Sequence, residues 1–179
     1  MKTYLNAPDV KTRLVNELKS KEKMLASITV AQVPGLDYLV GKTLEQFAKN
    51  REMGIAEAFI QLLLLTNLRG VVFYKNINLP LVIETIMQPQ ALVSSNGAAL
   101  PDDPKLLKHE RFYNTFPRFL ELVMQQKSMP LEAAVRKLAL DPARKFDLKE
   151  RGIIAQGAIA DLTLFSFSPE GKFKLARTI

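Results

Sequence analysis

Apolar residues recur along this chain with two different spacings, which predict both helices and strands. Apolar side chains stand every four positions over residues 10–18, as on the buried face of an amphipathic helix. Residues 28–33 are mostly β-branched and precede a Pro-Gly pair, which predicts a strand. Thr43 and Gln46 have the spacing of a capping box, so we expect a helix that begins after Thr43 and ends near Gly54.

The middle of the chain has the pattern of a β-α-β unit. A helix predicted over residues 56–64 is followed by a short apolar run at residues 71–74, a helix over residues 81–87 and a second apolar run at residues 91–94. Apolar strands flanked by helices are typical of sheets that are covered on both faces. We therefore predict that the two runs are strands of a parallel sheet.

After residue 97 the pattern changes to a loop followed by helices. Residues 98–108 contain two prolines and two adjacent aspartates, which indicates a loop. Helices are predicted over residues 116–124 and 131–138, the second of them capped by Ser128. A short helix is expected to start at residues 141–142, an Asp-Pro pair.

Beyond Gly152 the apolar spacing becomes two, which predicts a β-hairpin. Leu162 and Leu164 alternate with a threonine, and Phe173 and Leu175 follow after a Ser-Pro-Glu-Gly turn. These leucines are therefore expected on the apolar face of the hairpin.

Composition narrows the class of protein. The 179 residues, of which 47% are hydrophobic, suffice for one domain with an apolar core. A count of 25 Lys and Arg against 18 Asp and Glu gives a formal charge of +7, which could suit a nucleic acid. The cations of residues 19–23 and 144–151 alternate with acids, however, as on solvated helix faces. We expect no nucleic-acid partner.

Few residues could bind a metal or react as a thiol. The chain has one histidine and no cysteine, and no carboxylates are spaced to replace them as zinc ligands. The absence of cysteine fits a reducing cytosol. The first residues lack the apolar core of a signal peptide, and the longest apolar run, residues 59–65, is far shorter than the roughly 20 residues of a membrane span. We expect a soluble, cytoplasmic protein without a membrane partner.

Two neighbouring segments carry a resemblance to a known family. Residues 92–97 read Leu-Val-Ser-Ser-Asn-Gly, and residues 109–118 read His-Glu-Arg-Phe-Tyr-Asn-Thr-Phe-Pro-Arg. Together they resemble the end of the catalytic barrel in the D-aminoacylase (N-acyl-D-amino-acid deacylase) family of the amidohydrolase superfamily. The resemblance places Asn96 where the family has its catalytic Asp. An amide can neither take a proton from a metal-bound water nor supply a carboxylate ligand.

The resemblance covers residues 28–165 and corresponds to the back part of a complete family member. It includes the run at residues 151–162, in which Asp161 is similar to a structural aspartate of the superfamily. The family's His-x-His strand and middle-strand metal ligands have no counterpart here. The implied fold class is α/β: the C-terminal part of a (β/α)8 barrel over residues 1–150, and strands of a small β-sandwich over residues 151–179.

The resemblance also suggests site residues, each with a plainer alternative. Ser95, Asn96 and Gly97 would be the remnant of an active site at the end of a barrel strand, although Asn-Gly is elsewhere an ordinary turn. Arg111 corresponds to the family's arginine that is thought to hold the substrate's α-carboxylate, a task for a bidentate donor, or it is a surface-loop arginine. His109 is grouped with Arg111, Ser95 and Gly97 for substrate binding, and it also fits a solvated loop residue.

Two functions from different classes are compatible with these observations. The chain is either a C-terminal fragment or degenerate relative of an enzyme that hydrolyses N-acyl-D-amino acids, inactive by itself, or a non-catalytic binding or assembly module. No cofactor is expected in this chain, whereas zinc belongs to the full-length family. An incomplete barrel leaves open sheet edges, so we expect a complementary N-terminal barrel chain or a second copy as partner.

Overall fold

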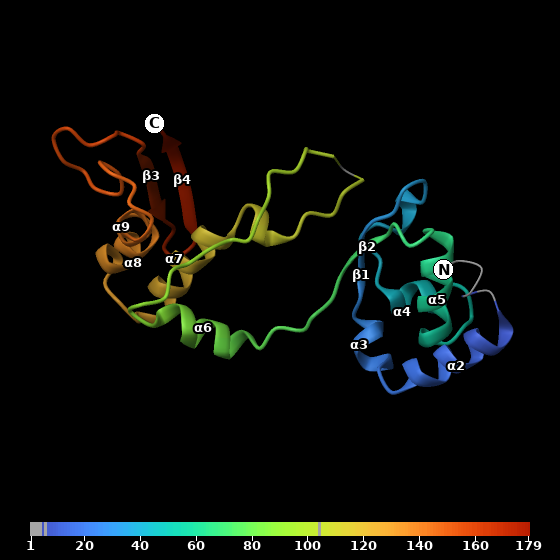
Figure 1. Ribbon diagram of the computed structural model, residues 1–179. Coiled ribbons are helices and arrows are strands. Elements are labelled where there is room, and N and C mark those ends of the chain that lie inside the picture. Colours follow the sequence, from blue (N-terminus) through green and yellow to red (C-terminus); the bar gives the residue numbers. More distant parts are fainter. Residues whose placement is uncertain (1–4, 6, 104) are drawn as a thin grey trace. The chain divides into compact units, whose positions relative to one another are not determined.

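The computed structural model describes Leu5, residues 7–103 and residues 105–179, which form two compact units (Figure 1). Unit 1 contains the described residues up to Ile77 together with Leu100–His109. Unit 2 contains Asn78–Ala99 and Glu110–Ile179. The boundary expected near residue 150 separates a barrel from a sandwich and stays a prediction.

Unit 1 consists of helices around a two-stranded sheet. Its strands pair antiparallel, with Thr29 opposite Phe73. The helices predicted over residues 10–18 and 56–64 and the strand predicted over residues 28–33 are confirmed. Its elements are α2 (Pro8–Lys19), α3 (Glu22–Ala26), β1 (Thr29–Gln32), η1 (Asp37–Leu39), α4 (Leu44–Lys49), α5 (Ile55–Leu65) and β2 (Val71–Phe73).

The capping box that starts α4 is present as predicted. The Thr43 hydroxyl accepts the Gln46 N–H at 3.2 Å, and the Gln46 side-chain oxygen accepts the Thr43 N–H at 2.9 Å. The helix directs Leu44 and Phe47 into the core, where they meet buried side chains of β1 and α5. The predicted end of this helix is wrong, because α4 stops at Lys49 and Gly54 is the N-cap of α5.

The predicted parallel β-α-β unit is wrong. β2 pairs antiparallel with β1, and residues 91–94 form no strand. The helix between them is α6 (Leu79–Met87), whose N-cap Asn78 accepts the Leu81 N–H at 3.3 Å. The physical reason is that β2 finds its hydrogen-bond partners in β1, while Val93 packs against side chains of a helix. An apolar run can be buried in either way.

Unit 2 packs α6 and three further helices with a β-hairpin (Figure 1). The predicted helices and hairpin are confirmed, but Ser128 does not cap α8; Pro130 holds that position, and the Ser128 hydroxyl lies 3.5 Å from Met87 Sδ. Within the described ranges, no helix is long and apolar enough to cross a membrane. The remaining elements are η2 (Glu110–Phe112), α7 (Thr115–Gln126), α8 (Leu131–Leu138), α9 (Leu140–Lys145), β3 (Thr163–Phe167) and β4 (Phe173–Thr178).

The hairpin contains a β-bulge that changes the predicted faces. Phe165 lies opposite Leu175, whereas its neighbour Leu164 lies opposite Arg177, so Ala176 is an extra residue in β4. Phenylalanine rings of both strands pack against α7 and α8. Leu164 is the neighbour of Phe165 in β3 and so faces the opposite side, with 60% of it exposed; its predicted place on the apolar face is therefore wrong. Leu175 lies opposite Phe165 but is itself 58% exposed.

Candidate functional site

The predicted strand-end residues form a tight turn in unit 2. The Ser95 hydroxyl oxygen accepts the backbone N–H of Gly97 at 3.0 Å. Asn96 lies between them with a φ of 45°, in the left-handed region that asparagine tolerates better than most residues. Its side chain is exposed, while Ser95 is half-buried. The Asn-Gly pair therefore acts as a turn, whatever chemistry the amide has.

Gly97 allows this turn to lie against the segment that contains Arg111. A Cβ atom at Gly97 would lie 2.9 Å from the Arg111 carbonyl oxygen and 3.2 Å from the Phe112 Cα. Both atoms belong to the backbone of η2, so a side chain here would force the two segments apart. Residues that are 14 positions apart in the printed sequence are thus adjacent in space.

Arg111 and His109 have different aromatic neighbours. The exposed Arg111 side chain places its guanidinium 5.2 Å from the centroid of the Phe112 ring. His109 belongs to unit 1, where its ring meets Phe73 edge-on with the centroids 5.2 Å apart. The candidate site of unit 2 therefore consists of the turn at residues 95–97 and Arg111.

The residues of this site do not fit a zinc ion. A catalytic zinc takes three or so side-chain ligands from His, Cys, Asp and Glu. In the part of the chain that the structure describes, no three such side chains come together to hold a metal ion. Asn96 offers a neutral amide oxygen and Ser95 a hydroxyl, which are weak ligands for zinc. No metal-dependent step can be assigned to this cluster.

An apolar groove of about 600 Å³ lies elsewhere in unit 2 and is lined by none of the predicted site residues. Its walls come from α7, α8, the hairpin and the loop at residues 151–162. Arg151 and Asp161 line it and form an ion pair with each other, so they bring no net charge to the groove. This pairing is compatible with a structural role for Asp161.

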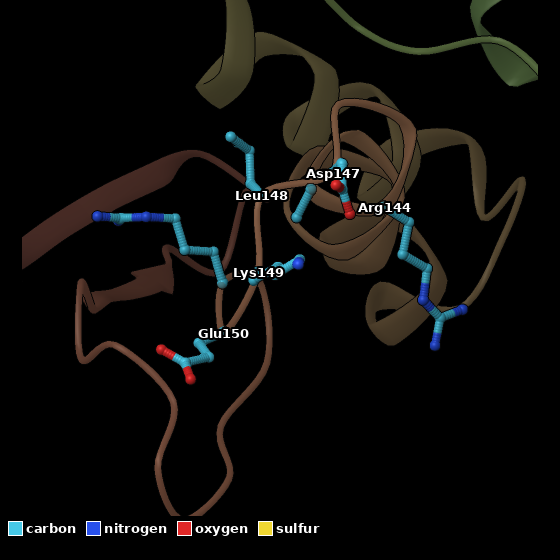
Figure 2. A pocket seen from close by; sticks show the side chains of 7 residues that line it. Arg144, Asp147, Leu148, Lys149 and Glu150 are labelled. Carbon is cyan, nitrogen blue, oxygen red and sulfur yellow. The ribbon is translucent and has the colours of Figure 1, made fainter.

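A smaller pocket of about 290 Å³ lies beside the end of α9 (Figure 2). Charged side chains line it, but the Arg144 and Glu150 side chains point away from each other. Because its charges do not converge, this pocket has no arrangement that would recognise one ionic group.

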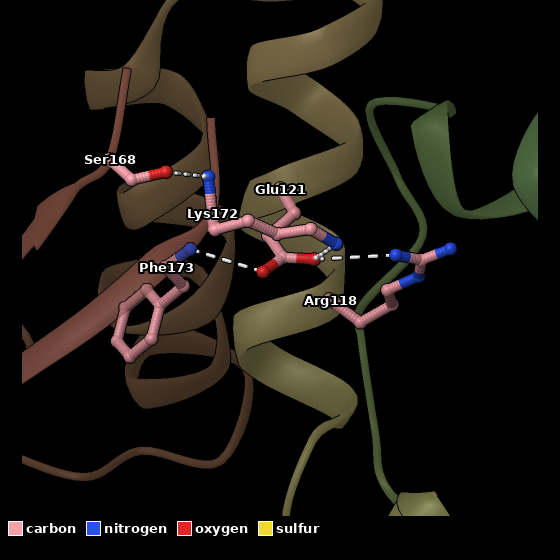
Figure 3. Close-up of polar contacts among 5 residues, drawn as sticks. All are labelled: Arg118, Glu121, Ser168, Lys172 and Phe173. Carbon is pink, nitrogen blue, oxygen red and sulfur yellow. Dashed lines mark hydrogen bonds and ion pairs between the residues drawn. The ribbon is translucent and has the colours of Figure 1, made fainter. Parts of the chain in front are cut away.

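Glu121 is a buried carboxylate that the sequence pattern did not single out. It is 8% exposed, and its Oε1 accepts the Phe173 N–H at 3.0 Å (Figure 3). Its Oε2 lies 3.3 Å from Arg118 Nη1 and 3.4 Å from Lys172 Nζ. The Phe173 hydrogen bond, with help from Lys172 and Arg118 and against the effect of burial, lowers the pKa of Glu121. This carboxylate fastens the hairpin to α7.

Lys137 is the second buried charge that sequence analysis missed. It is 4% exposed, and its Nζ donates a hydrogen bond to the Gln88 carbonyl oxygen. Burial lowers the pKa of Lys137, and the nearby charge of Asp141 partly opposes this. A signal existed, since Lys137 follows the buried Ala134 by three residues and so shares its helix face.

Solved structures define the class of this fold. The N-acyl-D-glutamate deacylase of Bordetella bronchiseptica, in complex with zinc and a phosphonate inhibitor, matches 89% of this chain and 34% of its own, with a TM-score of 0.67 and 22% identity. A D-aminoacylase said to define a subset of amidohydrolases matches 83% of this chain and 29% of its own, with a TM-score of 0.62 and 28% identity. The fold thus has the α/β content of a part of these amidohydrolases.

Two curated relatives match a part of the chain at the level of sequence. The N-acyl-D-aspartate deacylase of Alcaligenes xylosoxydans xylosoxydans is 40% identical over 78 residues, and the N-acyl-D-glutamate deacylase of that organism is 41% identical over 75 residues. These matches span 43% and 41% of this chain, but 15% and 14% of the relatives. No family model matches the chain. The predicted resemblance is confirmed: this chain is related to the N-acyl-D-amino-acid deacylases and D-aminoacylases, over a part of their length.

Proposed function

We propose that this chain is the C-terminal portion of an amidohydrolase of N-acyl-D-amino acids and does not hydrolyse them by itself. The observation that supports it is the turn at residues 95–97 held against η2, at the position where the family resemblance places the catalytic Asp. In this proposal residues 1–150 contribute to a (β/α)8 barrel and residues 151–179 to a small β-sandwich. The proposal includes a cytosolic location, with which the absence of cysteine is compatible.

The chemistry of the cluster supports substrate binding and argues against proton transfer. Asn96 presents an uncharged amide, which can form hydrogen bonds but cannot act as a base near neutral pH. Arg111 is exposed, and its planar guanidinium suits the two oxygens of an α-carboxylate. The Ser95 hydroxyl can accept or donate a further hydrogen bond. Zinc is a property of the full-length relatives and is not assigned to these residues.

The alternative function is a non-catalytic binding or assembly module. Exposed apolar side chains in unit 2 favour it, since Ile154 lines the apolar groove and is 91% exposed. Contiguous apolar surface usually marks an interaction site. Both functions therefore include a complementary N-terminal barrel chain or a second copy as partner, and light scattering at micromolar concentration tests that expectation.

A hydrolysis assay tests the catalytic part of the proposal. The chain and its Asn96→Asp variant are incubated with N-acetyl-D-glutamate, with and without added zinc. We expect no free D-glutamate from either protein, because a carboxylate at position 96 still lacks partner ligands. Release by the unaltered chain would overturn the proposal that it is inactive by itself, and zinc-dependent release by the variant would show that the active site is misplaced.

A binding titration tests the role of Arg111. Amide chemical shifts of residues 95–97 are followed while N-acetyl-D-glutamate is added to the chain, to Arg111→Gln and to Arg144→Gln, an exposed arginine in the same unit. We expect shifts in the chain and in the control, and their loss in Arg111→Gln. Equal shifts in all three proteins would remove Arg111 from the site.

A further inference from the structure

We propose that Lys137 is a positioning residue, whose buried ammonium fixes the turn from which the Asn96 segment leaves α6. The inference rests on the proposed function in one respect, namely that residues 95–97 belong to the candidate site. In this proposal a side chain of α8 helps to position the candidate site, although Lys137 lies far from Asn96 in the sequence.

The Gln88 carbonyl oxygen is the point of attachment. It accepts the Ala91 N–H at 3.1 Å, which closes a four-residue turn with proline at its second position. The same oxygen accepts Lys137 Nζ, from a residue 49 positions further along the chain. Gln88 is also the C-cap residue of α6. One tertiary contact thus holds the oxygen that sets the direction in which the chain leaves the helix.

Burial strengthens the contact between the Lys137 ammonium and the Gln88 carbonyl oxygen. Lys137 as a whole residue is only 4% exposed, so hydrogen-bond acceptors of the protein must replace water around its ammonium. The C-terminal end of a helix, where Gln88 lies, carries partial negative charge that favours a cation. The charge of Asp141 acts in the same direction. The ammonium therefore has a strong preference for one place, and the turn is held at that place.

Apolar contacts connect the position of the turn at Gln88 to the position of the candidate site. Ile86 and Met87 before the turn and Val93 after it pack against the core cluster of α7 and α8. The segment is thus gripped on both sides of the turn and ends where Gly97 lies against the Arg111 backbone. Since a few residues separate Gln88 from Ser95, a change in the turn alters the position of the Ser95–Gly97 hydrogen bond.

The test compares Lys137→Met, which keeps a long side chain but removes the ammonium, with the control Lys149→Met at an exposed lysine of unit 2. Amide hydrogen exchange and chemical shifts are measured by NMR on the full chain. In Lys137→Met we expect the Ala91 amide to exchange about tenfold faster or more, as loss of a bond to a charged donor implies, and the resonances of residues 95–97 to move. The Val123 amide and the control variant should keep their values.

Two results would overturn the proposal. One is unchanged exchange at Ala91 in Lys137→Met, and the other is equal acceleration at Ala91 and Val123, which would make Lys137 a general contributor to stability. If Lys137→Met does not fold, the ¹H–¹⁵N correlation of the ammonium in the unaltered chain decides. A slowly exchanging Nζ signal with a nuclear Overhauser contact to the Ala91 amide supports the proposal, and its absence contradicts it. None of these measurements needs hydrolysis or ligand binding.

Discussion

Unit 1 and unit 2 are held together in different ways. The core of unit 1 is one cluster of buried apolar residues that includes side chains of α3, β1, α4 and α5, among which Leu44 and Ala58 are fully buried. The buried core of unit 2 is smaller, consisting of Phe119, Leu120, Val123 and Ala134, and rings of the hairpin complete it. Among the described residues, both buried charged side chains belong to unit 2.

Apolar burial in unit 1 and buried charges in unit 2 contribute to the fold in different ways. Apolar burial is strong but non-directional, so it stabilises unit 1 without fixing any one contact. A buried carboxylate or ammonium contributes less net stability, because it must first be dehydrated, but it accepts only a narrow geometry. Unit 2 uses Glu121 and Lys137 to join segments that are remote in sequence, and it is the unit that contains Asn96 and Arg111.

The largest effect is expected from Phe47→Ala in unit 1. Phe47 is 3% exposed, and its removal leaves a cavity that costs about 3–5 kcal/mol of unfolding free energy. Urea unfolding followed through NMR signals of each unit measures it, with Tyr38→Ala, at a 57% exposed residue of the same unit, as control. Simultaneous loss of unit 2 signals at lower urea would show that the units do not unfold separately.

A smaller effect, about 1–2 kcal/mol, is expected in unit 2 from Glu121→Gln, which removes the charge from three hydrogen bonds. Because the folded state lowers the pKa of Glu121, its contribution is present above the ordinary value of 4.5 and is lost as the pH falls through the lower folded value. Urea midpoints of the chain and the variant should therefore converge in acid. Glu132→Gln, at an exposed residue of α8, is the control. A difference that persists in acid would mean that the effect of the substitution does not come from the carboxylate charge.

The smallest effect is expected from Thr43→Ala in unit 1. The variant loses the side-chain half of the capping box of α4, which costs about 1 kcal/mol. Thr12→Ala, within α2, is the control and should cost less, because its hydroxyl bonds to a carbonyl of its own helix. Thermal unfolding of unit 1 measures both. An equal change in the two variants would contradict a specific role for the cap.

Local patterns predicted most of the helices and the hairpin, because each depends on residues close in sequence. The capping box of Thr43 and Gln46 is an example. The strand predicted over residues 91–94 is wrong because an apolar run indicates that its side chains are buried but does not indicate which element of the fold covers them. Val93 packs against the core cluster of α7 and α8, and no residue near Val93 specifies that choice.

Some features of the candidate site also follow from the local sequence, whereas others depend on tertiary structure. The Asn96-Gly97 turn follows from the residue types, and its geometry agrees with that expectation. Contact of Gly97 with the Arg111 backbone and of Lys137 with Gln88 depends on tertiary structure. The spacing of Lys137 from Ala134 places it on the buried helix face, but a lysine in an amphipathic helix pattern is ordinarily assigned to solvent, so the residue type outweighs that signal.

The bulge in β4 also has a consequence for how the sequence can vary in length. Residues on one strand face alternate, so if β4 ran through Ala176 without a bulge, the cation of Arg177 would share the face of Phe173 and Leu175. Because the bulge leaves Ala176 unpaired, Thr178 takes that place and lines the apolar groove. Deletion of Ala176 would therefore restore a regular ladder and keep Arg177 and Thr178 on their present faces. The hairpin is expected to tolerate the loss of this one residue, because the residue lies outside the ladder.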